Sequence, residues 1–195
     1  MIFPESQLAH KYCKGKGLEI GAGAHNPFGL NTLNVSLAMP VDQEQELKMC
    51  GKNAPADIHA SGDNIPVPDA SQDFVVSLHL LEHFPDVIKT LLEWYRVLKP
   101  GGIIFMIVPH MERTFDKDNP RTTLNHIIED YKKGATIETH EVLPGGHYHA
   151  WITEDVVEIV DWLKKEKKLP IKILEVQDVD DKVGNGFSVV VKKLR

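Results

Sequence analysis

Cysteine and long apolar runs are both scarce in this sequence. Its 195 residues include only two cysteines, Cys13 and Cys50, which are too few for the disulfide framework of a small secreted domain. No apolar run approaches the roughly 20 residues that cross a membrane, and the N-terminal region lacks the apolar core of a signal peptide. We therefore expect a cytoplasmic protein without a membrane span.

An excess of positive charge is also missing. The 22 lysines and arginines are outnumbered by 28 acidic residues, so the net charge is -6 with the histidines neutral. The only basic cluster, Lys164 to Lys168, is short and is interrupted by Glu166. Proteins bind the phosphates of nucleic acids mainly through lysine and arginine, and we therefore expect no nucleic-acid partner.

The remaining composition is typical of a globular protein. Hydrophobic residues make up 42% of the chain and charged residues 26%, and the length suits one domain, which we expect to span residues 1–195. Histidine is the unusual residue, because the chain has ten. Composition alone does not predict an oligomeric state.

Short apolar runs alternate with helical patterns through most of the chain. Residues 17–21 form an apolar run that ends in glycine, while 73–78 and 103–108 are continuous apolar runs too short for helices. Between the last two, apolar residues recur with the helical period from Phe84 to Leu98. This order predicts βαβ units in a parallel α/β sheet. Further strands are expected at 33–37, 56–60, 171–176 and 187–191.

The stretch 109–150 breaks this alternation. It holds one amphipathic segment, between Leu124 and Tyr131, in an otherwise polar sequence rich in histidine. We interpret it as an insertion that lies over the carboxyl ends of the strands and forms a lid on the acceptor site. A helix with Thr153 as its N-cap follows, and residues 151–195 then close the sheet with a hairpin.

A glycine loop follows the first expected strand. Gly21 and Gly23 let the backbone approach a ligand closely, although a simple glycine turn would have the same sequence. A dinucleotide-binding loop would have a third glycine where Asn26 stands and a helix behind it, but Pro27 follows instead. We expect the connection to the second strand to be mostly loop.

Four motifs in order resemble the class I S-adenosylmethionine-dependent methyltransferases, in particular their small type-11 domain group. They are Leu18-Glu-Ile-Gly-Ala-Gly23, Ile65-Pro-Val-Pro-Asp69 with Ser71-Gln-Asp-Phe-Val-Val-Ser77, Leu81-Glu-His83, and Trp94-Tyr-Arg-Val-Leu-Lys-Pro-Gly-Gly102. The resemblance covers about residues 17–110, the expected cofactor-binding core. It implies a Rossmann-like, seven-stranded, mostly parallel sheet with an antiparallel last strand and helices on both faces. It also implies S-adenosylmethionine as cofactor and S-adenosylhomocysteine as product.

The resemblance further implies which residues bind the cofactor. They are Glu19, Gly21, Ala22, Gly23, Ser36, Ser61, Gly62, Asp63, Ser77, Leu78 and His79. Ser36 and Ser61 depart from the family, which usually has acids there for the ribose hydroxyls and the adenine amino group. Three alternatives remain open: weakened binding, substitution by Asp63 or Asp42, or loss of cofactor binding.

Histidines are the candidate catalytic and substrate-binding groups. His79 and His110 follow the fourth and fifth expected strands, and imidazole is suited to remove a proton from an acceptor near neutral pH. His83, His147 and His149 are candidates for the substrate site, although His83 lies in a turn where capping is an equal alternative. His147 and His149 also have a spacing that suits zinc, but no third ligand follows from the sequence, and we assign no metal site.

These observations predict a methyltransferase that acts on a small or glycan-like acceptor. The polar insertion favours a hydrophilic acceptor over an apolar one. The alternative is a non-catalytic methyltransferase-like module that has lost cofactor binding and serves in an assembly. A nucleotide-dependent oxidoreductase is less favoured because of Asn26 and Pro27.

Overall fold

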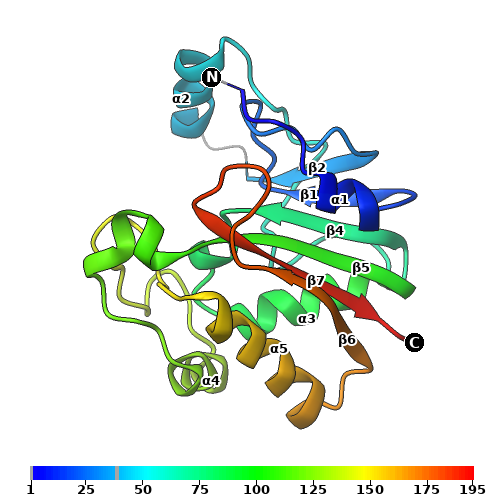
Figure 1. Ribbon diagram of the computed structural model, residues 1–195, viewed down its shortest axis with the longest axis vertical. Helices are drawn as coiled ribbons and strands as arrows, with labels where there is room; N and C mark the ends of the chain where they lie inside the picture. Colours follow the sequence, from blue (N-terminus) through cyan, green and yellow to red (C-terminus); the bar gives the residue numbers. More distant parts are fainter. Residues whose placement is uncertain (1, 38–39) are drawn as a thin grey trace.

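The computed structural model describes residues 2–37 and 40–195, and the side chains of 40–42 lie outside the described part. Seven strands form one sheet with the order β3-β2-β1-β4-β5-β7-β6 (Figure 1). The strands are β1 (Gly17–Ile20), β2 (Thr32–Ser36), β3 (Ile58–His59), β4 (Gln72–Leu78), β5 (Leu98–Pro109), β6 (Ile171–Gln177) and β7 (Gly186–Lys193). The α-helices are α1 (Gln7–Tyr12), α2 (Pro40–Cys50), α3 (Val87–Val97), α4 (Leu124–Lys133) and α5 (Thr153–Glu166). Short 3-10 turns are η1 (Leu81–His83), η2 (Met111–Arg113) and η3 (Phe115–Asp118).

The direction of the strands confirms the expected architecture. Strands β1 to β5 pair in parallel, and β7 is antiparallel to both of its neighbours, β5 and β6. Strand order reverses between β1 and β4, because the chain first builds outward to β3 and then returns to add β4 on the other side. Open α/β sheets bind their ligands at such a switch point, beyond the carboxyl ends of the strands.

Two apolar clusters cover the two faces of the sheet. The larger cluster joins α3, α5 and Ile127 of α4 to one face, and the smaller one joins α1 and Phe28 to the other. Strand β5 is buried from Gly102 to Pro109, as its continuous apolar sequence predicts.

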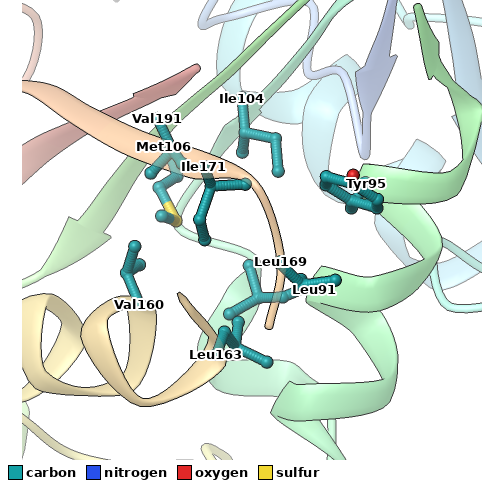
Figure 2. A pocket seen from close by; sticks show the side chains of 9 residues that line it. All are labelled: Leu91, Tyr95, Ile104, Met106, Val160, Leu163, Leu169, Ile171 and Val191. Carbon is teal, nitrogen blue, oxygen red and sulfur yellow. The ribbon is translucent and has the colours of Figure 1, made fainter. Parts of the chain in front are cut away.

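The larger cluster contains a small void between α3, α5 and the sheet (Figure 2). Its volume of about 10 Å³ is at the lower limit for a single water molecule, and its nine lining side chains are almost entirely apolar. This void is a packing defect of the core, and it has no room for a substrate or cofactor.

Several element boundaries differ from the expected ones for local reasons. The helix expected from Phe84 begins at Val87, because Asp86 caps it by accepting a hydrogen bond from the Lys89 backbone N–H at 2.8 Å. Thr153 was expected as an N-cap but is the first residue of α5, and Ile152 is the N-cap. The Asp155 side chain completes the cap by accepting a hydrogen bond from the backbone N–H of Ile152 at 2.9 Å.

The connection between β1 and β2 contains no helix, as expected. Helix α1, which the sequence pattern did not indicate, precedes β1 and packs with Phe28 on the face that a crossover helix would cover. The insertion also differs from the expected simple lid. It leaves β5 through η2 and η3, but α4 then packs against α3 and α5 at the side of the sheet. Within the described residues, no helix is both long and apolar enough to span a membrane.

Candidate cofactor site

Two adjoining cavities lie beyond the carboxyl ends of β1 and β4. Their volumes are about 450 and 250 Å³, within or near the roughly 300–1,000 Å³ of small-molecule sites. The residues that line both cavities are Gly21, Gly23, His25 and His79. Their position at the switch point of the sheet makes them the candidate ligand site.

The glycine loop is held in place from outside by two polar side chains. The backbone N–H of Ala22 donates to Asn34 Oδ1 at 3.0 Å, and that of Ala24 donates to Glu46 Oε1. Gly21 has a φ of 67°, which a residue with a side chain rarely adopts. A Cβ on Gly23 would lie 3.1 Å from Glu46 Oε1. The backbone conformation thus favours glycine at Gly21, whereas a side chain at Gly23 would have to displace the side chains of His25 and Glu46.

Glu19 supplies a buried carboxyl group to the smaller cavity. Its side chain accepts a hydrogen bond from Thr32 Oγ1 at 3.2 Å and is only 8% exposed. Burial raises the pKa of Glu19 to about 7, although Thr32 and the charge of Lys182 oppose the shift. A cationic group bound in this cavity would stabilise the ionised form of Glu19.

The segment after β4 contributes His79 to both cavities. His79 has a φ of 46°, and its Nε2 is buried without a hydrogen-bond partner. Burial lowers the pKa of His79 to about 4, so its imidazole is neutral at physiological pH. Leu78 lines the smaller cavity, whereas the Ser77 side chain is buried in the sheet and lines neither.

The residues predicted to bind the ribose and those predicted to bind the adenine lie in different places in the structure. Ser36 lines the larger cavity together with Ala22, as the resemblance implies. Ser61, Gly62 and Asp63 line neither cavity. The carboxylate of Asp63 accepts hydrogen bonds from Ser61 Oγ and from Lys89 Nζ, the latter at 2.7 Å. The side chain of Asp42 lies outside the described residues.

Gly62 has a packing function. A Cβ at this position would lie 2.5 Å from Ile20 Cγ2 and 2.8 Å from Phe84 Cζ. Its carbonyl accepts a hydrogen bond from Trp94 Nε1 at 2.9 Å. Gly62 therefore lets the segment after β3 pass close to β1 and α3.

Glu46 is a cavity residue that the sequence motifs did not reveal. It lies on α2, and its Oε2 accepts the Ala54 backbone N–H at 2.9 Å while its Oε1 holds the glycine loop. The nearby His25 Nδ1 is 3.5 Å from Oε1. The sequence offers no signal for Glu46, because α2 is too polar to be recognised by an apolar period.

A second set of polar side chains, centred on His83, borders the larger cavity. The His83 ring meets the His147 ring edge-on with centroids 4.7 Å apart, and His147 Nδ1 is 2.8 Å from Asp116 Oδ2. Beside them, Glu82 is fully buried, and neither of its carboxylate oxygens has a hydrogen-bond partner. Burial raises the pKa of Glu82 to about 8, and the negative charge of Asp116 adds to the effect.

The other two predicted histidines lie elsewhere. His110 is 6% exposed, packs edge-on against Phe187, and lines neither cavity. Burial, together with the charge of Arg113, lowers the pKa of His110. His149 lies 5.0 Å from His140, ring to ring, in a separate cluster away from His147. The structure thus brings His79, His83 and His147 together and leaves His110 and His149 out.

Comparison with known sequences places the cofactor half of the chain in one family. Residues 18–106 match the family described as "Methyltransferase domain". Over 109 residues, 53% of this chain, the sequence is 29% identical to the probable S-adenosylmethionine-dependent methyltransferase of Mycolicibacterium smegmatis and covers 42% of that protein. Over 45 residues, 23% of this chain, it is 47% identical to the demethylmenaquinone methyltransferase of a Geobacillus strain and covers 19% of it. The chain therefore spans less than half the length of these curated relatives.

Solved structures share the fold. An S-adenosylmethionine-dependent methyltransferase from Thermotoga maritima superposes with a TM-score of 0.56 at 16% identity, over 96% of this chain and 86% of that one. A protein from Pyrococcus horikoshii gives a TM-score of 0.57 at 17% identity, with the same coverage of 96% and 86%. The motifs and the family match lead to one conclusion for residues 18–106: they form a methyltransferase domain similar to the class I S-adenosylmethionine-dependent methyltransferases, whose fold the whole chain shares.

Proposed function

We propose that this protein transfers a methyl group from S-adenosylmethionine to a small, hydrophilic or glycan-like acceptor. The observation that carries the proposal is the pair of adjoining cavities at the switch point, bounded by the glycine loop and the end of β4. The family assignment implies S-adenosylmethionine as the cofactor. When bound, it supplies an activated methyl group on a sulfonium, and the protein's task is to align the two reactants and exclude water.

The residues of the smaller cavity fit the methionine end of the cofactor. S-adenosylmethionine carries an ammonium group there, and among the described side chains only Thr32 donates a hydrogen bond to the buried carboxyl group of Glu19. Gly21 and Gly23 leave room for a ligand against bare backbone. We assign Glu19 to hold the ammonium group and the glycine loop to contact the remainder of that end.

The larger cavity fits the nucleoside. Ser36 offers a hydroxyl group for a ribose, and Glu46 lines the same wall with a carboxylate. Because Glu46 already accepts two backbone N–H groups, its main role is to keep the glycine loop in position. Ser61 and Asp63 contact each other and Lys89, and we assign them no direct contact with the cofactor unless their loop moves.

The acceptor is proposed to enter beside His83. This wall carries His83 and His79, with His147 and Asp116 behind them, and polar groups of this kind select a hydrophilic acceptor. We assign His79 as the base that takes the acceptor's proton, because its imidazole is neutral at physiological pH and lines both cavities. The position of His110 outside both cavities favours His79 over His110 as the base.

Calorimetric titration with S-adenosylmethionine and S-adenosylhomocysteine tests the proposal. We expect binding to the wild type and at least tenfold weaker binding to Gly23→Val. His59→Ala, at an exposed position on β3, is the matched control for both measurements. Absence of heat at millimolar ligand would instead support the non-catalytic alternative.

A further inference from the structure

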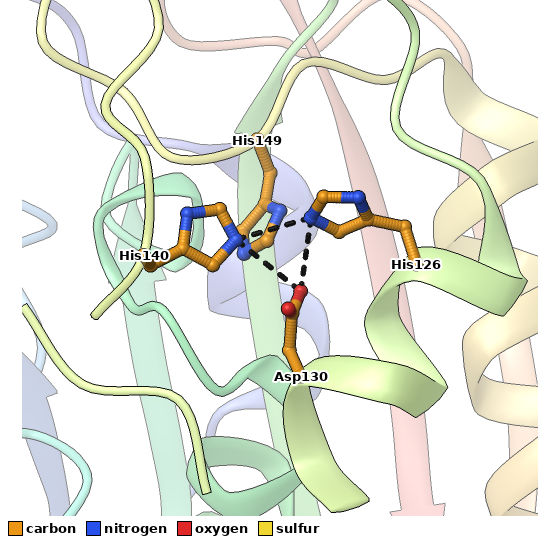
Figure 3. Close-up of side chains that lie close together, drawn as sticks. All are labelled: His126, Asp130, His140 and His149. Carbon is orange, nitrogen blue, oxygen red and sulfur yellow. Dashed lines mark hydrogen bonds and ion pairs between the residues drawn. The ribbon is translucent and has the colours of Figure 1, made fainter. Parts of the chain in front are cut away.

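Four side chains meet outside the cofactor site. His126 and Asp130 lie one turn apart on α4, and His140 and His149 come from the loop that follows it (Figure 3). One potential metal-binding atom from each residue lies within 4.8 Å of those of the other three. None of the four lines either cavity of the cofactor site. The cluster therefore needs an explanation of its own.

Three of the atoms form a tight triangle. His126 Nε2 and His140 Nε2 are 3.1 Å apart, and Asp130 Oδ2 lies 3.1 Å from the former and 3.3 Å from the latter. Figure 3 shows both imidazole nitrogens directed toward each other and toward the carboxylate. Zinc bonds of about 2.0–2.1 Å in a tetrahedral site place neighbouring ligand atoms about 3.3–3.4 Å apart. The triangle has nearly the dimensions of one face of such a site.

The protonation of His140 shows which of its ring nitrogens is available to a metal ion. His140 Nδ1 lies 2.7 Å from the Glu141 carbonyl, which can only accept, so Nδ1 carries the proton and Nε2 of the neutral ring does not. The lone pair of Nε2 then lies 3.3 Å from a carboxylate oxygen, which is also an acceptor. Either a proton shared with His126 Nε2 or a cation must therefore lie beside these two acceptors, and a metal ion bound by all three atoms would satisfy their lone pairs at once.

The fourth side chain offers a further lone pair. His149 Nε2 lies 3.1 Å from the Phe84 carbonyl and donates to it, which leaves Nδ1 unprotonated. That Nδ1 is buried and has no hydrogen-bond partner. The ring is fixed by stacking on Trp151, with centroids 5.3 Å apart. Metal-binding histidines characteristically donate their second nitrogen to a carbonyl or carboxylate in this way.

We propose that His126, Asp130, His140 and His149 bind one zinc ion. Imidazole and carboxylate ligands in a tetrahedral arrangement suit zinc, and four protein ligands are typical of a structural site. The ion joins α4 to the loop of residues 134–150 and, through Phe84, to the turn before α3. A separate cavity of about 380 Å³ borders His126, Asp130 and His140 and gives the ion a path from solvent.

A second cluster, Glu82, His83 and His147, is the less suitable metal site. It offers three residues, His147 Nδ1 already pairs with Asp116 at 2.8 Å, and His83 lines the cofactor cavity. We therefore use this cluster as an internal comparison in the test.

Zinc binding is tested on the full chain with any histidine tag removed. Zinc content is measured after equilibration with excess metal and dialysis, and affinity by competition with a chromophoric chelator. We expect one zinc per chain in the wild type and at least tenfold weaker binding in His126→Ala and Asp130→Asn. His59→Ala, with an exposed histidine on β3, and His83→Ala, in the second cluster, are expected to bind zinc like the wild type.

Two further readouts make the result decisive. Cobalt(II) in the site should give the intense visible absorption of tetrahedral coordination, and zinc should raise the melting temperature of the wild type but not of the two variants. Because the His126 side chain is half-exposed, we expect the His126→Ala variant to keep its fold. Absence of stoichiometric zinc in the wild type, or equal zinc affinity in all variants, would overturn the proposal. Loss of zinc only in His83→Ala would assign the metal to the second cluster.

Discussion

Glu82 offers a quantitative test of how burial changes the pKa of a carboxyl group at the edge of the site. Its side chain is fully buried, neither carboxylate oxygen has a hydrogen-bond partner, and His83, His147 and Asp116 are the titratable groups around it. Burial raises its pKa from 4.5 to about 8. The folded protein therefore keeps the Glu82 proton over a pH range in which the unfolded chain has already lost it.

The sign of the effect on stability follows from this difference. Below pH 4.5 the carboxyl group is protonated in both the folded and the unfolded state, and its contribution to the free energy of unfolding is fully present. Between pH 4.5 and about 8 the unfolded state ionises first, so the free energy of unfolding falls as pH rises. At about 1.4 kcal/mol for each pKa unit, the loss has an upper limit of about 5 kcal/mol.

The perturbation is Glu82→Gln, which keeps the shape of the side chain and cannot ionise. We expect the variant to gain stability relative to the wild type as pH rises, from little difference at pH 5 to several kcal/mol at pH 9. Urea unfolding across this pH range measures the difference, and Glu158→Gln on the exposed face of α5 is the matched control. Wild-type and Glu82→Gln curves that run parallel from pH 5 to 9 would refute the reasoning.

Three further substitutions test the packing and the loop anchors. Gly62→Ala should lower the free energy of unfolding by about 1–3 kcal/mol in urea titration, because its Cβ would lie 2.5 Å from Ile20 and 2.8 Å from Phe84. Asp86→Ala should cost about 1 kcal/mol in the same titration through loss of the α3 N-cap, and no change would show that another group caps the helix. Glu46→Ala releases two loop N–H groups and should weaken S-adenosylhomocysteine binding in calorimetry more than it lowers the melting temperature.

The elements with strong local patterns could be predicted from the sequence. Strands β4 and β5 are continuous apolar runs, α3 has a clear apolar period, and the terminal hairpin brackets a glycine-rich turn. Helices α1 and α2 could not. The first has only six residues, and the second is polar along most of its length, so neither has an apolar stripe to recognise.

The candidate site was predictable only where its residues are local in sequence. Gly21, Gly23 and His79 lie just after the ends of two predicted strands, and the structure brings them to the same cavities. Glu46 reaches the glycine loop across space, from a helix more than twenty residues further along the chain, and no spacing rule connects the two.

The histidine-rich stretch shows the same limit. His147 and His149 were expected to act together because they are two residues apart. The backbone between them is not a regular strand, and the two rings enter different clusters. The partners of His149 are His126 and His140, which the fold of the insertion brings together.

The central claim is that S-adenosylmethionine binds between the glycine loop and the end of β4. Titration of the ¹⁵N-labelled protein with S-adenosylhomocysteine, followed through its glycine amide resonances, tests it most directly. The account predicts large, saturable shifts at Gly21 and Gly23 and none at Gly101 or Gly134, which line neither cavity of the cofactor site. Saturation of the protein with S-adenosylhomocysteine without a shift at Gly21 and Gly23 would contradict it.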